Sequence, residues 1–208
     1  MSRHSLFVVG LATAQLLAAP SAFAQTYPDH DWTHGSTLQL FGGAAMAPSS
    51  DTHPTLGAGL GWEINRWVSI EGIGAWLVAR HDNEAFAAEM TAVANLTHPR
   101  TIVPYLGAGV GMYVASFDSG SGAMPPFYQQ RLSASNVTTR QTFTDPSFVF
   151  AAGANIFAGT HVSLRPDVTL RLVTSGGDAY PVTTVAVHFS YHFEAHGAKP
   201  ARSQETTR

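Results

Sequence analysis

Eight segments of this 208-residue chain place an apolar residue at every second position, and turn residues separate them. The alternation is sharpest from Leu56 to Glu63, where Leu, Ala, Leu and Trp face three glycines and a glutamate. Period-two patterning predicts β-strands with one apolar face, so the whole chain is expected to be all-β. The eight segments are Ser36–Ala47, Thr55–Glu63, Trp67–Ala79, Ala85–Leu96, Ile102–Ala115, Ser147–Phe157, His161–Val173 and Tyr180–Phe193.

Two features favour a closed barrel over a soluble β-sandwich, although both folds use strands with one apolar face. Short connections such as residues 64–66 alternate with longer ones, the longest running from Ser116 to Pro146. The non-apolar face consists largely of glycines with a few charges, which suits the crowded interior of a small barrel. We therefore predict an eight-stranded antiparallel up-and-down transmembrane β-barrel over residues 36–193, with the short turns on the side of the N-terminus. The alanine-rich segment Ala85–Leu96 also suits a helix, and that alternative stays open.

Aromatic residues support the same prediction, because they gather near the ends of the strands. Membrane barrels carry aromatic girdles where the strands meet the two membrane interfaces. The candidate girdle residues are Trp62, Trp67, Trp76, Phe148, Tyr180, Tyr191 and Phe193.

The two ends of the sequence predict export and a disordered tail. Residues 1–24 begin with a basic pair, continue through an apolar stretch and close on Ala-Phe-Ala, the pattern of a cleaved signal peptide. Residues 25–35 form a polar lead-in, and residues 194–208 form a polar tail that we expect to be disordered in the periplasm. After the leader, no segment offers the roughly 18 uninterrupted apolar residues of a transmembrane helix.

The composition excludes several classes of function. Charged residues make up 12% of the chain, about half of the share usual in soluble domains. A net charge of −3 and a single lysine, Lys199, provide no basic field for nucleic acid. The absence of cysteine excludes disulfides, thiolate metal sites and cysteine nucleophiles. The histidines are scattered, so we expect no metal site and no cofactor.

Six charged residues fall on the glycine-rich face and are predicted to point into the barrel. Buried charges need partners, and long side chains from opposite walls of a small barrel can meet at its axis. Counted from the short-turn side, Glu71 and Arg165 lie low, and Glu89 and Arg171 lie higher. We expect an interior salt-bridge plug without an open channel, and the alternative is a gated ion path. The six residues are Glu63, Glu71, Glu89, Arg165, Asp167 and Arg171.

The long loop Ser116–Pro146 is the strongest candidate for contact with an extracellular ligand. Long loops without regular structure are uncommon unless they are functional or disordered, and aromatic and Arg side chains are typical of binding surfaces. A plain variable surface loop is the alternative. The candidate contact residues are Phe127, Tyr128, Arg131 and Arg140.

Three stretches carry a family resemblance: Arg66–Glu71 (RWVSIE), Val103–Gly111 (VPYLGAGVG) and the closing aromatic strand that ends at Phe193. With them, the chain resembles the small outer-membrane β-barrels of Gram-negative bacteria, such as the outer membrane protein A transmembrane domain and the opacity-type surface proteins. It departs from their pattern at His188, where a glycine is usual, and in the tail beyond Phe193. The resemblance implies contact with outer-membrane lipid and lipopolysaccharide, assembly by the barrel-insertion machinery, and a role in membrane integrity or in surface interaction through extracellular loops.

Three other functional classes remain as alternatives. The first is a narrow transporter of small or hydrophobic solutes. The second is a lipid A-modifying enzyme, because His161–Ser163 and His188–Ser190 resemble the His-x-Ser of lipid A deacylases, which need a base, a nucleophile and an acidic partner. The Asn that follows that Ser is replaced by Leu164 and Tyr191, so we do not expect an enzyme. The last alternative is an exported soluble β-sandwich.

Overall fold

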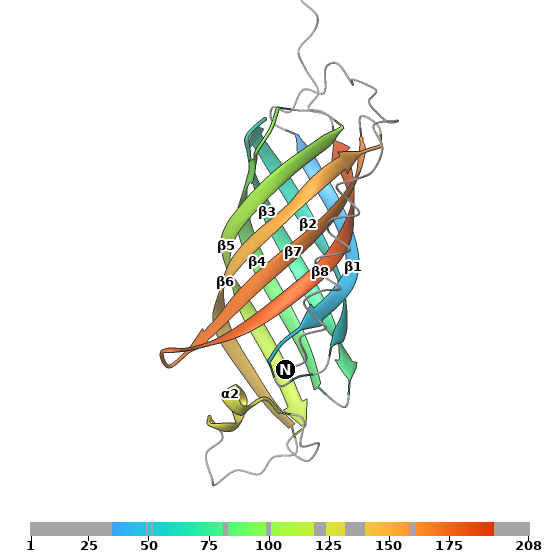
Figure 1. Cartoon of the computed structure of the whole chain (residues 1–208). Coiled ribbons are helices and arrows are strands. Elements are labelled where there is room, and N and C mark those ends of the chain that lie inside the picture. Colours follow the sequence, from blue (N-terminus) through green and yellow to red (C-terminus); the bar gives the residue numbers. More distant parts are fainter. Residues whose placement is uncertain are drawn as a thin grey trace, which may run out of the picture.

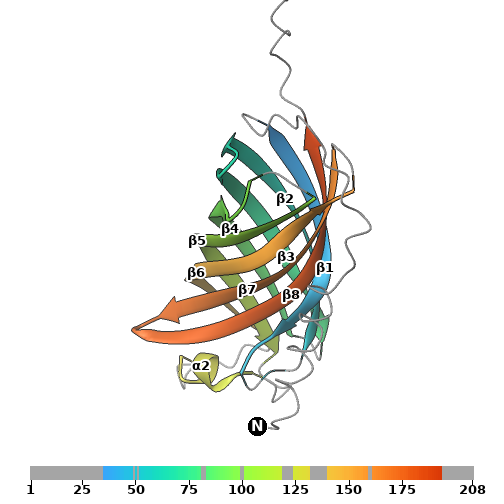
Figure 2. The same cartoon turned by 45° about the horizontal axis from the view of Figure 1, so that its top comes forward.

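The computed structural model of the chain describes residues 35–48, 50, 52–80, 83–98, 101–118, 124–131, 140–158 and 161–193, so the expected signal peptide, nearly all of the lead-in and the tail lie outside the described residues. Eight antiparallel strands pair in chain order, and β1 also pairs with β8, which closes the sheet into a barrel (Figure 1). Figure 2 shows the same wall of tilted strands from a second direction. The strands are β1 Ser36–Met46, β2 His53–Asn65, β3 Val68–Arg80, β4 Asn83–Asn95, β5 Ile102–Asp118, β6 Arg140–Phe157, β7 Val162–Ser175 and β8 Asp178–Phe193. The predicted eight-stranded barrel is therefore confirmed, and the segment that also suited a helix is strand β4.

The barrel is apolar outside, and most of the side chains that point inward are buried. On β2, Leu60 is 67% exposed and Trp62 is also exposed, whereas the next residue, Glu63, is buried. In water this arrangement would leave a continuous apolar band unburied, so lipid is the medium that it fits. Within the described part of the chain, no helix is long and apolar enough to cross a membrane.

Two tight turns show how local chemistry joins neighbouring strands. We call the end where β1 begins and β8 ends the terminal end, and the opposite end the loop end. At the terminal end, the Asn65 side-chain oxygen accepts the backbone N–H groups of Trp67 (2.8 Å) and Val68 (3.0 Å), as in an Asx turn. At the loop end, β7 and β8 are joined by Gly176 and Gly177 with φ of +61° and +98°. Positive φ is what a two-residue hairpin turn of the primed type requires, and glycine adopts it at little steric cost.

The expected division into short turns at one end and long loops at the other is wrong for three connections. At the loop end, β3 joins β4 through residues 81–82 and β7 joins β8 through residues 176–177, which are both two-residue connections. At the terminal end, β4 joins β5 through the longer residues 96–101. At the loop end, the hydrogen-bonded strands continue beyond the residues that alternate between apolar and polar. Strand pairing depends on backbone hydrogen bonds, so it does not need apolar side chains outside the membrane.

The long loop is also shorter than predicted, since residues 119–139 connect β5 to β6. Strand β5 continues to Asp118 and β6 begins at Arg140, and these two residues pair at the end of the ladder. The stretch from 140 to 146 is mostly polar, so a search for apolar alternation assigns it to a loop.

One of the expected girdle residues faces the wrong way for that role. Tyr180 on β8 is buried inside the barrel, whereas Tyr191 and Phe193 on the same strand are exposed on its outer face. Position 180 has the inward parity of β8, so the strand's own two-residue period accounts for the difference.

The glycine at position 57 makes room for a large inward ring. A Cβ on Gly57 would lie 2.2 Å from the Phe41 ring and 2.3 Å from the Gly74 carbonyl oxygen. The Phe41 ring stacks on His188 with centroids 4.5 Å apart, so it has little freedom to move. We predict that Gly57→Ala lowers the free energy of unfolding by about 1–3 kcal/mol, the usual range for overpacking. Urea unfolding in lipid vesicles measures this.

The matched control is Gly72→Ala on the lipid-facing side of β3, where the nearest atom to a new Cβ is 4.0 Å away. We expect little change there. Equal losses for the two variants would contradict the steric explanation.

Candidate functional site

The interior of the barrel has two halves of opposite character. The half next to the terminal end holds buried polar and charged residues, and the half next to the loop end holds a cluster of alanine, valine, leucine and aromatic residues. Phe41 of the apolar cluster stacks on His188 of the polar half, so the two halves are in direct contact.

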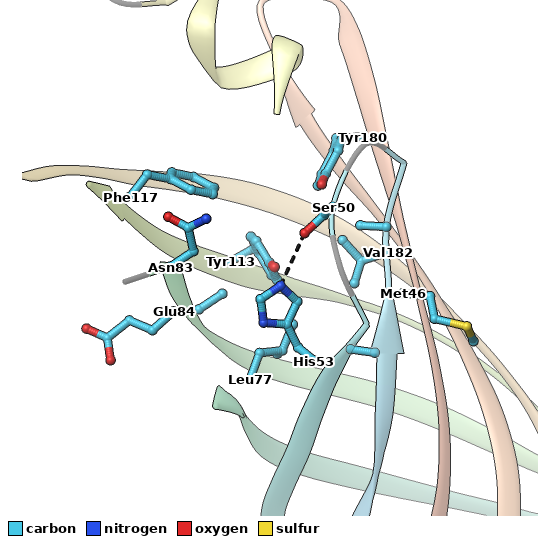
Figure 3. A pocket seen from close by; sticks show the side chains of 13 residues that line it. Met46, Ser50, His53, Leu77, Asn83, Glu84, Tyr113, Phe117, Tyr180 and Val182 are labelled. Atoms are coloured by element: carbon cyan, nitrogen blue, oxygen red, sulfur yellow. Dashed lines mark hydrogen bonds between the residues drawn. The ribbon is translucent and has the colours of Figure 1, made fainter. Parts of the chain in front are cut away.

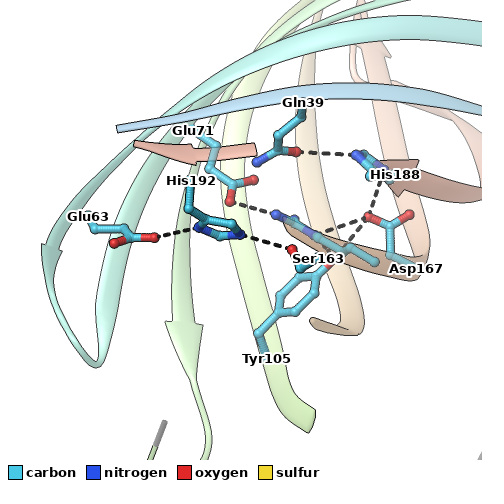
Figure 4. A network of polar contacts seen from close by, with 9 residues as sticks. Gln39, Glu63, Glu71, Tyr105, Ser163, Asp167, His188 and His192 are labelled. Atoms are coloured by element: carbon cyan, nitrogen blue, oxygen red, sulfur yellow. Dashed lines mark hydrogen bonds and ion pairs between the residues drawn. The ribbon is translucent and has the colours of Figure 1, made fainter. Parts of the chain in front are cut away.

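Arg165 contacts Glu71, Tyr105 and Asp167, whose side chains converge in the polar half (Figure 4). Its Nη1 donates to Glu71 Oε1 at 2.6 Å, and its Nε donates to the Tyr105 hydroxyl at 2.6 Å. The Tyr105 hydroxyl donates in turn to Asp167 Oδ2 at 2.8 Å, and the guanidinium lies 4.1 Å from the centroid of the Tyr105 ring. Because these residues come from β3, β5 and β7, the contacts cross the barrel and fill its centre.

His188 and His192 extend this network to the remaining carboxylates. His188 Nε2 lies 3.1 Å from Asp167 Oδ2, and its Nδ1 lies 3.2 Å from Gln39 Oε1. His192 Nδ1 lies 3.1 Å from Glu63 Oε1. The His188 and His192 imidazoles therefore lie beside Asp167 and Glu63, respectively. Neither of these carboxylates accepts a short hydrogen bond from the Arg165 guanidinium.

A second cationic group lies nearer to the loop end. The Arg171 guanidinium donates to both carboxylate oxygens of Glu89, and its Nη1 donates to the Thr184 hydroxyl at 2.7 Å. Two hydrogen bonds join the guanidinium to the carboxylate, so the ion pair is bidentate. Arg171 and Glu89 are both buried inside the barrel.

The structure places all six charges of the expected plug inside the barrel. It brings Glu71 to Arg165 and Glu89 to Arg171, and Asp167 Oδ2 lies 3.9 Å from Arg165 Nε. The other polar members of the network were missed, although their strand parity is the same as that of the six predicted residues. The missed residues are Gln39, Tyr105, Ser163, Thr184, His188 and His192.

Ser163, His192 and Glu63 form a chain with the connectivity of a nucleophile, a base and an acid. Ser163 Oγ lies 2.9 Å from His192 Nε2, and the other ring nitrogen faces Glu63. Ser163 is 0% exposed, however, so no substrate can reach its hydroxyl in this arrangement. Within the described part of the chain, no group of three or more His, Asp or Glu side chains could hold a metal ion.

The described part of the long loop folds over the loop end as a short helix, α2 (Pro126–Gln129). Tyr128 is 0% exposed, and its ring centroid lies 4.8 Å from that of Phe117 and 5.0 Å from that of Phe143. Phe127 stacks on Tyr180 with centroids 5.3 Å apart and an angle of 18° between the planes. Burial raises the pKa of the Tyr128 phenol, so this residue stays uncharged. Its hydroxyl has no hydrogen-bond partner among the residues that the structure describes.

The four expected loop-contact residues mostly engage the barrel itself. Phe127 and Tyr128 pack inward, as described above. Arg131 pairs with Asp145 at 2.7 Å, and Arg140 pairs with Glu84. Arg131 and Arg140 remain partly exposed at the rim, so they are the members of the set that a partner could touch.

A pocket lies beside α2 at the loop end (Figure 3). Its free space is about 30 Å³, which is room for about two water molecules. Phe117 and Tyr180 line the pocket and also touch the rings of α2, so the pocket and the aromatic cap share one wall. The other lining residues are Ala45, Met46, Ala47, Ser50, His53, Leu77, Asn83, Glu84, Ala85, Tyr113 and Val182.

A closed barrel with an apolar outer band defines a β-barrel membrane protein. The family model described as "Outer membrane protein beta-barrel domain" matches residues 9–193, so the chain belongs to this family and is an outer-membrane protein. No curated protein matches the chain.

The chain shares its fold with several solved structures. Neisserial surface protein A is 12% identical with a TM-score of 0.56, and the match covers 76% of this chain and 96% of that one. The N-terminal barrel domain of Pseudomonas aeruginosa OprF is 9% identical with a TM-score of 0.54, covering 76% and 98%. OprG from Pseudomonas aeruginosa is 13% identical with a TM-score of 0.51, covering 80% and 99%. At these identities the likeness extends to the fold alone.

Proposed function

We propose that this protein is a closed, non-conducting barrel that supports the integrity of the outer membrane. The buried network from Glu71 through Arg165 to Asp167, with the Arg171–Glu89 pair beyond it, carries the proposal. Ions would have to break charge-assisted contacts to pass, because the interior of an eight-stranded barrel is narrow enough for inward side chains to fill it. In this proposal the terminal end faces the periplasm and the loop end faces outward.

The partners in this proposal are outer-membrane lipid around the barrel, lipopolysaccharide at the outward rim, and the barrel-insertion machinery during assembly. The partly exposed guanidiniums of Arg131 and Arg140 support a contact with lipopolysaccharide, since Arg binds phosphate groups through charge-assisted hydrogen bonds. The same rim is where a surface partner would touch the long loop.

Planar-bilayer recording of the full chain tests the closed barrel directly. We expect no steady conductance above that of the bare bilayer, because charged side chains fill the path. Steady large conductance would refute the plug. Loss of the gene is expected to sensitise cells to detergents and bile salts, and an unchanged envelope would count against the integrity role.

A second candidate function, a narrow path for small or hydrophobic solutes, is favoured by the apolar half of the interior. Solute flux into proteoliposomes distinguishes it from a closed barrel. A lipid A-modifying activity is not proposed, because the Ser163 hydroxyl of the Ser163–His192–Glu63 chain is fully buried.

A further inference from the structure

Aromatic rings occupy the centre of the apolar half of the interior. Some of these rings belong to strands of the barrel, and others belong to α2. Small inward residues such as Ala45, Ala85 and Ala115 line this half. The space between them is taken by large side chains, including Tyr113 and Tyr180 from the strands. We call the space that these alanines border, and that the rings occupy, the chamber. The ion pairs lie in the other half of the interior.

Two of the rings at this chamber belong to α2, which lies outside the sheet. Phe127 stacks on Tyr180, and Tyr128 meets Tyr180 with centroids 5.6 Å apart and planes at 70°. Tyr128 also lies against Phe117. Stacked and edge-to-face contacts are the preferred geometries of aromatic pairs, so the walls of the chamber are suited to planar rings.

The Tyr128 ring is well packed, but the Tyr128 hydroxyl is not hydrogen-bonded within the described residues. This hydroxyl is fully buried. Polar groups line the adjoining pocket, among them Asn83, Glu84 and His53, whose Nε2 is 3.2 Å from Ser50 Oγ (Figure 3). A free ring with a polar substituent could turn that substituent toward His53, which the tethered Tyr128 does not do.

We propose that the loop end of the barrel binds a small, uncharged, planar aromatic molecule in place of the Phe127 and Tyr128 rings. The ligand stacks on Tyr180 and packs against Phe117, and a hydroxyl or N–H substituent bonds at His53 or Ser50. Segment α2 lifts when the ligand enters, because the present free space holds only water-sized molecules. Binding needs no passage through the ionic half, so this inference goes beyond the proposed function and does not depend on it.

The test is a titration of the full chain in phosphatidylcholine nanodiscs with 1-naphthol, followed by amide chemical shifts at Ala45 and Val182. We expect saturable binding. Tyr128→Ala removes the competing ring and is expected to tighten the dissociation constant by about tenfold, because the binding-competent state no longer has to displace it. Ala85→Phe fills the chamber and is expected to weaken binding by about tenfold or more.

Ala88→Phe is the matched control, because Ala88 lies on the same strand but is exposed on the lipid side. It should bind as the wild type does. Equal shifts in all four proteins would mean that the probe sits in the lipid, and this would overturn the proposal. Absence of saturable binding even in Tyr128→Ala would overturn it as well.

A heat-shift gel checks that each variant forms a closed barrel, and Val182→Phe replaces Ala85→Phe if the latter does not fold. The two proposals fail in different assays. Steady conductance in planar bilayers removes the closed barrel without touching the ligand site, and non-saturable titrations remove the ligand site without opening the barrel.

Discussion

Replacing Arg165 with methionine is expected to lower the free energy of unfolding by about 3–5 kcal/mol, the range for removing one partner of a buried ion pair. The guanidinium side chain is 3% exposed and faces Glu71 and Asp167, which are buried as well. Its loss leaves Glu71 without its cation, leaves Asp167 with His188 alone as an ion-pair partner, and removes the donor to the Tyr105 hydroxyl. Urea titration of the full chain in lipid vesicles, followed by tryptophan fluorescence, gives the change in unfolding free energy.

Arg140→Met is the matched control for that experiment. Arg140 pairs with Glu84 at the rim, where the two side chains are 55% and 38% exposed. Water and salt screen exposed pairs, so we expect a loss of about 0–1 kcal/mol. If both substitutions had the same effect, the interior network would not be a buried network in the folded barrel.

Strand parity is the part of this site that could be predicted from the sequence. In a β-strand the side chains alternate with a period of two, so a residue's face follows from its neighbours once the apolar face is known. This rule places Glu71 and Arg165 inside, where they are found. It also applies to Tyr180, which was assigned to the girdle because of its residue type although its parity is inward.

The partners of each inward side chain could not be predicted in the same way. Which residues meet across the axis depends on the stagger of the closed sheet, and parity contains no information about stagger. Ser163 and His192, for example, are 29 positions apart and meet only because β7 and β8 pair in one particular register. A rule that looks for His and Ser two positions apart on one strand therefore does not find this contact.

The long loop shows a different limit. Aromatic and Arg residues in a long connection are typical of a binding surface, but Tyr128 packs into the mouth of its own barrel. Residue type in a loop does not reveal whether the partner is another molecule or the same chain. Only the inward alanines of the loop half, Ala45 and Ala85 among them, indicate that space exists there for a ring.

Substitutions of Arg171 and Glu89 are expected to be strongly coupled in their effects on the free energy of unfolding. Removing either side chain alone, as in Arg171→Met or Glu89→Leu, is expected to lower the free energy of unfolding by about 3–5 kcal/mol, since one charge stays buried without its partner. The double variant Arg171→Met/Glu89→Leu is expected to come within about 1 kcal/mol of the wild type, because apolar replacements of a buried pair are often neutral or stabilising.

The Thr184 hydroxyl, which accepts from Arg171, loses that donor in both Arg171 variants, so its contribution cancels when they are compared. Additive losses of about 6–10 kcal/mol in the double variant would show that the two side chains do not interact in the folded barrel. The double variant could regain stability and still show no conductance in planar bilayers. That result would separate the charge of the pair from its role in filling the interior. Apolar side chains of similar volume would then close the barrel as well as an ion pair does, and the filling of the interior, rather than its charge, would be what excludes ions.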